Sequence, residues 1–173
     1  SFPLSLGGFR RQFFQKENIM LCKFAREFLL KLPETLKTEK NPNPTASMVP
    51  NGYLLLFGPE HAEEQYRALE NHMACEAGTK NIKGSELSNV FPYVNCDGIE
   101  TATYTDTKIE GWIDPYLLHN ALKNKAIELG AKFIKGEIKS LNDLNANIIV
   151  SAAGCWTNEL LNDVPVFPQK HTV

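Results

Sequence analysis

The segment from Asp114 to Trp156 constrains the fold of this chain more than any other part of its sequence. Asp114 is a residue type that caps helices, Pro115 suits a first helical turn, and Gly130 is a typical helix end. Between these ends, apolar residues recur at the spacing of one helix face: Leu118, Leu122, Ala126 and Leu129. The sequence therefore predicts a helix that begins after Asp114 and stops at Gly130.

Two apolar stretches and a glycine turn follow this helix. Residues 131–138 and the nearly all-apolar residues 147–151 are each predicted to form a strand. Ala152-Ala153-Gly154 then forms a tight turn into a second helix that starts near Thr157. This order of helix, strand, strand, glycine and helix predicts part of a layered α/β domain.

The same kinds of signal predict the earlier elements. Apolar spacing predicts a helix over Glu17 to Leu36, which Pro33 should kink. The other expected elements are a strand over Tyr53 to Phe57, a helix from Pro59 to about Ala77, a short helix capped by Ser85 and a strand over Ile99 to Tyr104. The longest apolar run, Tyr53 to Phe57, is far shorter than the roughly 20 residues of a membrane span, so no integral membrane protein is expected.

Composition narrows the classes of function. The 173 residues are 43% hydrophobic, which is enough for one packed core. With 18 basic and 20 acidic residues interspersed along the chain, there is no basic stripe for nucleic acid to bind. The four cysteines are dispersed without a Cys-x-x-Cys pair, which favours unpaired thiols over a disulfide framework or a metal site.

Two glycine turns could carry chemistry. The turn at Gly154 opens a helix, where backbone N–H groups and the helix dipole favour a phosphate; the alternative is a simple packing turn. Gly7-Gly8 allows close backbone approach to a flat ring, and Arg10 offers a planar cation to an anionic substrate or reduced cofactor. The alternative there is a turn followed by two solvated arginines. No hydrolytic constellation and no Gly-x-Gly-x-x-Gly occur in the sequence.

Several short motifs, taken in order, resemble the DAO-type FAD-dependent oxidoreductases of the glycine oxidase and sarcosine oxidase kind. They are Ser5–Phe13, Gly52-Tyr53-Leu54, Gly111–Pro115, Lys125-Ala126, Leu129-Gly130-Ala131, Ile149–Trp156 and Pro165–Lys170. The resemblance covers essentially the whole chain and implies a mixed α/β fold with FAD-binding and substrate-binding parts interleaved along the sequence. It assigns residues 1–40 and 111–164 to the FAD domain, residues 41–110 mainly to the substrate domain, and residues 165–173 to a return to the substrate domain.

The resemblance also implies a set of site residues and FAD as the cofactor. Arg10 would be the catalytic residue that contacts an anion near the flavin. The residues that would contact the cofactor are Ser5, Gly7 and Gly8 beside the flavin, Ile138 on the adenosine side through its backbone, and Ala153, Gly154 and Trp156 in a second turn.

One family feature is missing from this sequence. The strand–Gly-x-Gly-x-x-Gly–helix unit of the dinucleotide-binding βαβ motif does not occur, so the fold is expected to be incomplete. We therefore expect the isolated chain neither to hold FAD nor to be active.

The resemblance implies oxidation of a C–N or C–OH bond of a small amine, amino acid or hydroxy acid by hydride transfer to flavin. The alternative is a non-catalytic flavoprotein that acts in the assembly of respiratory complex I and contacts its subunits or assembly intermediates. This alternative comes from likeness to a mitochondrial branch of the family, which also implies a mitochondrial location. Residues alone do not separate these two functions.

Overall fold

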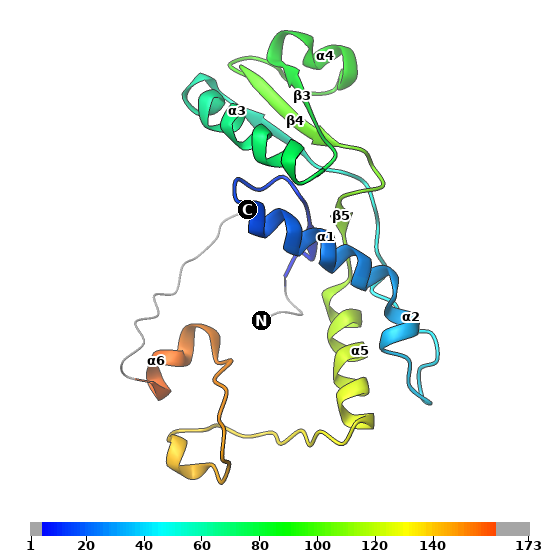
Figure 1. Cartoon of the computed structure of the whole chain (residues 1–173), viewed down its shortest axis with the longest axis vertical. Helices are drawn as coiled ribbons and strands as arrows, with labels where there is room; N and C mark the ends of the chain where they lie inside the picture. The colour runs from blue at the N-terminus through cyan, green and yellow to red at the C-terminus, as the bar shows by residue number, and fades with distance from the viewer. Residues whose placement is uncertain (1–4, 162–173) are drawn as a thin grey trace. The chain divides into compact units, whose positions relative to one another are not determined.

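The computed structural model describes residues 5–161 of the chain. The chain divides into two compact units, Ser1–Ala131 and Lys132–Val173, and each is described by itself (Figure 1). The first unit holds a sheet with helices packed against it, whereas the described part of the second holds only short helical turns. The mixed α/β class predicted from the sequence is confirmed.

A three-stranded antiparallel sheet forms one half of the first unit. Its central strand is β4 (Thr101–Thr105), which pairs with β2 (Leu54–Phe57) on one side and β3 (Thr79–Lys83) on the other. Helix α3 (Pro59–Ala74) contributes Gln65, whose side chain donates a hydrogen bond to the Thr103 hydroxyl at 3.4 Å. Thr101, Ala102 and Thr103 are fully buried, so β4 is enclosed on both faces.

The opposite face of this sheet meets a short helical segment. A 3-10 turn, Gly84–Glu86, leads into α4 (Leu87–Val90), and Leu87 is fully buried. Phe91, which follows α4, packs edge-to-face on Tyr104 with ring centroids 5.2 Å apart. Because side chains alternate along β4, Tyr104 and Thr103 face opposite sides of the sheet, and the two helical layers therefore cover different faces.

The other half of the first unit is built on three helices. Helix α1 (Lys16–Leu30) is followed after Lys31 by α2 (Leu32–Thr35), so the helix predicted over residues 17–36 breaks two residues before Pro33. Pro33 lies in the first turn of α2, where a missing N–H costs nothing. A buried apolar cluster joins α2 to the later helix α5; its members are Leu32, Leu36, Ala46, Ile113 and Ala121.

Helix α5 (Pro115–Glu128) confirms the strongest sequence prediction. The Asp114 carboxylate accepts hydrogen bonds from the backbone N–H of Tyr116 at 2.8 Å and of Leu117 at 3.1 Å, as an N-cap should. Before α5, strand β5 (Gly111–Trp112) pairs antiparallel with β1 (Gly8–Phe9). These two short strands, and β3, were not predicted from the sequence.

The strands predicted over residues 131–138 and 147–151 are wrong: the structure has no strand there. The described part of the second unit, residues 132–161, contains two 3-10 turns, Leu141–Asp143 and Gly154–Trp156, and helix α6 (Thr157–Leu160). A strand requires a hydrogen-bonded neighbouring strand, and no strand pairing among the described residues includes either stretch. Ile134, Ile148 and Val150 are accordingly more than four-fifths exposed, at 90%, 84% and 83%.

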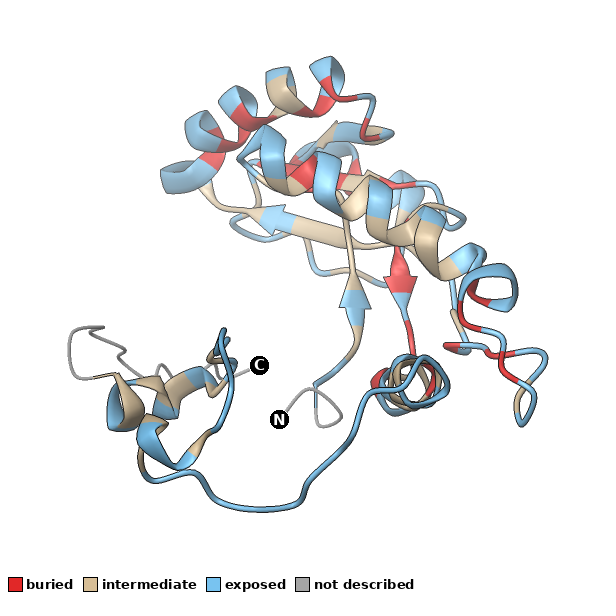
Figure 2. Ribbon diagram, turned by 60° about the horizontal axis from the view of Figure 1, so that its bottom comes forward, coloured by how far each residue is buried: buried red, intermediate tan, exposed pale blue. Residues whose placement is uncertain are grey.

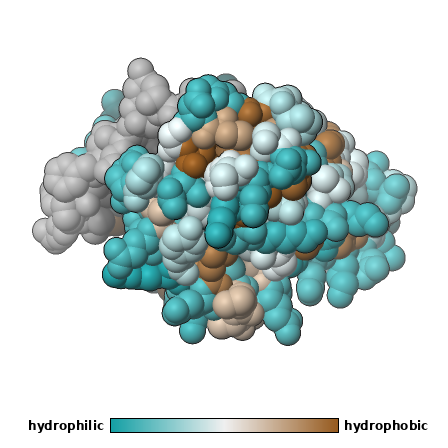
Figure 3. Space-filling model, turned by 90° about the horizontal axis from the view of Figure 1, so that it is seen from above, coloured by the Kyte–Doolittle hydropathy of each residue, from teal (hydrophilic) through white to brown (hydrophobic). Residues whose placement is uncertain are grey.

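Burial and surface character follow this division. Among residues 132–161 none is buried, whereas in the first unit buried residues line one side of α3 and fill most of β4 (Figure 2). On the face shown in Figure 3, hydrophilic side chains surround the hydrophobic patches. No helix within residues 5–161 is long and apolar enough to cross a membrane.

The fully buried carboxylate of Glu110 joins the N-terminal loop to the sheet. One of its oxygens accepts hydrogen bonds from the backbone N–H of Arg11 and, at 3.2 Å, of Gln12. The other accepts from Gln12 Nε2 at 2.8 Å and from the Thr105 hydroxyl at 2.6 Å. Since all four partners donate, both oxygens act as acceptors and the buried charge is fully hydrogen-bonded.

We predict that Glu110→Ala destabilises the fold by about 3 kcal/mol or more, because it leaves several buried donors without an acceptor. Glu110→Gln, which keeps one acceptor oxygen, should cost less. Urea unfolding followed by circular dichroism measures both changes. Glu63→Gln is the control, since Glu63 forms an exposed ion pair with Arg67 and should change stability little. Equal effects of Glu110→Ala and Glu63→Gln would contradict the role given to Glu110.

Candidate functional site

The two glycines of the N-terminal loop lie close to other parts of the same chain, and Gly7 is required by backbone contact. Gly7 has a φ of +68°, a left-handed conformation that side chains disfavour, and a Cβ there would collide with the Ile113 carbonyl oxygen. A Cβ on Gly8 would collide with the Tyr53 hydroxyl. The expected glycine turn is only partly seen, because Gly8 already belongs to strand β1. The two glycines approach Ile113 and Tyr53 of the same chain closely. Ser5 is exposed, and its hydroxyl accepts a hydrogen bond from Gly7 N at 3.3 Å.

Arg10 is half-buried beside an aromatic ring. Its guanidinium carbon lies 4.9 Å from the centroid of the Phe13 ring, a cation–π distance that fixes the head group. Within residues 5–161 no salt bridge involves Arg10. The planar cation is therefore positioned by a neutral partner, and its N–H donors can serve an anion.

Arg11 differs from the solvated arginine considered from sequence. It is half-buried, and its Nε is buried without a hydrogen-bond partner among the described residues. Burial, followed by the nearby Arg26 cation, lowers the pKa of Arg11, while the Glu110 carboxylate opposes that shift. Because Arg11 is half-buried with a buried Nε, it is a poor control for Arg10.

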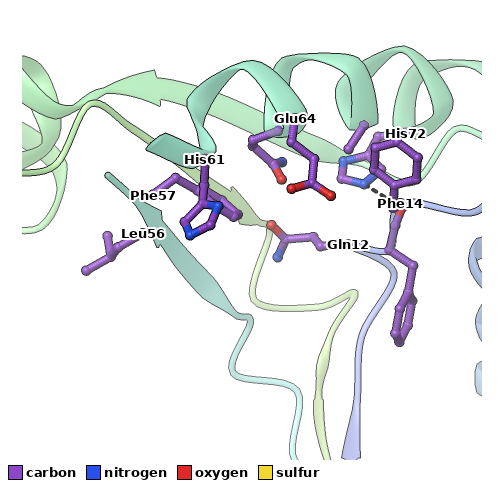
Figure 4. Close-up of a pocket in the computed structure, with 10 residues that line it drawn as sticks. Gln12, Phe14, Leu56, Phe57, His61, Glu64 and His72 are labelled. Carbon is purple, nitrogen blue, oxygen red and sulfur yellow. Dashed lines mark hydrogen bonds between the residues drawn. The ribbon is translucent and has the colours of Figure 1, made fainter. Parts of the chain in front are cut away.

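A pocket of about 400 Å³ lies between residues 12–14, strand β2 and helix α3. Figure 4 shows side chains of Gln12, His72 and Glu64 extending into it from the loop and from α3. Apolar side chains form much of the rest of its wall; those of Phe13, Phe14, Leu56, Phe57 and Ala68 contribute.

His72 is a neutral imidazole with one free nitrogen. It is 3% exposed, and its Nε2 lies 2.9 Å from the Phe13 carbonyl oxygen. A carbonyl only accepts, so Nε2 carries a proton, and in the neutral ring Nδ1 then holds a lone pair. Burial lowers the pKa of His72, which the hydrogen bond to Phe13 partly offsets. Nδ1 is buried and has no partner among the described residues.

Gln12 presents a second free acceptor to the same pocket. Its Nε2 donates to Tyr53 O at 3.2 Å and to the Glu110 carboxylate at 2.8 Å. Both partners only accept, so the amide cannot be turned around and Oε1 is the remaining atom. Gln12 is 5% exposed, and its Oε1 is buried with no partner in the described structure.

Sequence reasoning missed this pocket. One signal was present: Gln65, Ala68 and His72 recur at a spacing of three and four residues and share one face of α3. Two polar residues on a face that is buried indicate a site that needs hydrogen-bonding partners. The contribution of Gln12 depends on a contact between distant segments and could not be predicted.

The turn at Gly154, in the second unit, has features that fit a cofactor contact. Gly154 has a φ of +60°, and no described heavy atom lies within 4 Å of the position that a Cβ would take. The Ser151 hydroxyl just before it is buried and lacks a partner among the described residues. Open space beside a helix start and an unpaired polar group suit an approaching phosphate or ribose.

Three more residues of the second unit were predicted from the sequence to contact FAD: Ala153 and Trp156 beside Gly154, and Ile138 earlier in the chain. Ala153 precedes the 3-10 turn and its carbonyl accepts a hydrogen bond from Trp156 N at 3.2 Å. Trp156 is 59% exposed, and Ile138 is 40% exposed in a segment without regular structure. Ser5, Gly7, Gly8 and Arg10 belong to the first unit and these residues to the second. Their roles toward the cofactor stay predictions.

The four cysteines of the chain, Cys22, Cys75, Cys96 and Cys155, are free thiols in the structure. In the part of the chain that the structure describes, no group of three or more histidine, cysteine or acidic residues could hold a metal ion.

Comparison with known proteins places the chain in a family. Residues 5–173 match the family described as FAD dependent oxidoreductase. FAD-dependent oxidoreductase domain-containing protein 1 of Bos taurus is 30% identical over 96% of this chain and 34% of its own length. The Xenopus laevis protein of the same name is 32% identical over 87% of this chain and 30% of its own length. The chain thus spans about a third of these relatives.

Two solved structures share the fold. L-proline dehydrogenase from P. horikoshii aligns over 89% of this chain and 43% of its own, with a TM-score of 0.65 and 25% identity. Glycine oxidase from Geobacillus kaustophilus aligns over 76% of this chain and 35% of its own, with a TM-score of 0.58 and 18% identity, which speaks for the fold alone. With its family match running from residue 5 to residue 173, the chain belongs to the DAO family of FAD-dependent oxidoreductases, and its cofactor is FAD.

Proposed function

We propose that the whole protein oxidises a C–N or C–OH bond of a small amine, amino acid or hydroxy acid. The observation that carries this proposal is the overlap with L-proline dehydrogenase, at a TM-score of 0.65 and 25% identity, since that protein's name states an amino-acid substrate. Bound FAD would supply the hydride acceptor for this oxidation, whose product would be an imine or a carbonyl compound.

In this proposal the residues of the chain hold cofactor and substrate in register. The open turn at Gly154 would meet a phosphate or ribose of the cofactor with backbone groups. The loop at Gly7 and Gly8 would lie along the flavin, its path fixed by Ile113 and Tyr53. Arg10, steadied by Phe13, would bind the substrate carboxylate or a negative charge on the reduced flavin.

A second proposal is a non-catalytic flavoprotein of mitochondria. In it, FAD stabilises a fold that binds subunits or assembly intermediates of respiratory complex I. Two relatives, 30% and 32% identical to this chain, have names that state a domain and no substrate. Their names are therefore compatible with a non-catalytic role. The two proposals differ in whether a small molecule reduces the flavin.

Flavin reduction tests the first proposal directly. Under anaerobic conditions, at least one amine, amino acid or hydroxy acid in a panel should bleach the flavin absorbance of the whole protein. Arg10→Ala should slow that bleaching by roughly 10- to 150-fold, because it removes a charge-assisted contact of roughly 1.5–3 kcal/mol. Arg10→Lys, which keeps the charge without the planar fork, should fall between.

Arg67→Ala is the control for Arg10, since Arg67 is an exposed cation that pairs with Glu63 on α3. FAD content should be the same in all three variants. If no compound of the panel bleaches the flavin, the second proposal is favoured. If the flavin is bleached equally fast in the Arg10→Ala and Arg67→Ala variants, Arg10 does not have the proposed role.

We predict that Gly154→Val lowers the FAD content of the purified whole protein by about tenfold or more. A branched side chain would fill the open space that the cofactor needs. Gly130→Val is a matched control, because Gly130 also has a positive φ, of +98°, with no described atom within 4 Å of its Cβ position. Both variants carry the same kind of backbone strain. Equal flavin content in the two would make the Gly154 turn a packing feature only.

A further inference from the structure

The pocket under α3 contains two buried hydrogen-bond acceptors that receive no hydrogen bond from any residue between 5 and 161. These are Gln12 Oε1 and His72 Nδ1, on side chains that are 5% and 3% exposed. Leaving a buried polar atom unpaired is unfavourable. Each atom is identified as an acceptor by the hydrogen bonds that the other polar atoms of its side chain already form. A chain that keeps two such atoms on one pocket wall has a place for a ligand with donors.

A negative charge lies at the same pocket. Glu64 is an exposed residue that lines this pocket, and its carboxylate is directed toward it from α3 (Figure 4). Among the described residues Glu64 forms no salt bridge, whereas its neighbour in sequence, Glu63, pairs with Arg67. Two neutral acceptors and one carboxylate therefore face the pocket, a set that attracts a cationic donor and repels an anion.

The remaining wall fits an apolar body. Phe14, Leu56 and Phe57 line it, and the volume of about 400 Å³ lies within the range of small-molecule sites. A metal ion is a poor occupant, since no group of three metal-ligating side chains exists among residues 5–161. His61 also lines the pocket and is exposed.

We propose that this pocket binds a primary ammonium group attached to a short aromatic or aliphatic body. The ammonium group would donate to Gln12 Oε1 and His72 Nδ1 and would be neutralised by the Glu64 carboxylate. Three donors on one nitrogen match three acceptors, and the apolar body would lie against the aromatic wall. The proposal does not rest on the flavin reaction and involves none of the residues assigned to the flavin.

Three probes of one shape test the proposal by isothermal titration calorimetry on the whole protein. These are 2-phenylethylammonium, 2-phenylethanol and 3-phenylpropionate at neutral pH, where the ammonium is fully charged. The ammonium should bind at least about tenfold more tightly than the alcohol, since it adds a charge-assisted contact of more than 1.4 kcal/mol. The carboxylate should not bind here.

A pair of variants separates this pocket from any other amine site on the protein. Glu64→Gln should weaken ammonium binding by about fivefold or more, because it removes the charge but keeps the shape. Glu63→Gln, one residue away and paired with Arg67, should leave binding unchanged. The proposal is overturned if the three probes bind equally, if none binds, or if the two glutamate variants behave alike. The first result would mean an apolar cavity and the second a pocket filled by water or protein.

Discussion

The buried carboxylate of Glu110 is the contact on which the first unit depends. It lies between the central strand β4 and the short strand β5, and it accepts four hydrogen bonds, three of them from Arg11 and Gln12. A buried charge is tolerated only with such complete pairing, so the N-terminal loop has to lie where its donors meet this group. Gln12 is thereby oriented with Oε1 toward the pocket, and Arg10 is carried beside Phe13.

Local signals explain which elements could be predicted. The Asp114 cap and the apolar face of α5 lie within one segment, as do the start of α3 at Pro59 and the apolar run that became β2. The strands predicted over residues 131–138 and 147–151 have the right composition, but a strand needs a partner to exist. No strand pairing among residues 5–161 includes these two stretches, so the apolar pattern alone wrongly predicted strands there.

The candidate site depends even more on contacts between distant segments, which local sequence patterns do not reveal. The glycine turns at Gly7 and Gly154 were visible in the sequence, and both have positive φ. The reason for Gly7 was not visible, because it is the Ile113 carbonyl, more than a hundred positions later. The free acceptors of Gln12 and His72 were not predicted from the sequence, since a free acceptor is recognised only when every other bond of its side chain is known.

Amide hydrogen exchange in Glu110→Gln tests the central role of Glu110 most directly. A glutamine there offers one acceptor oxygen in place of two, so the N–H groups of Arg11 and Gln12 lose a shared charged acceptor. Their exchange should become about tenfold faster or more, which corresponds to about 1.4 kcal/mol, while Thr103 in β4 stays protected. Unchanged exchange at Arg11 and Gln12 would contradict the account, because the loop would then be held by something other than Glu110.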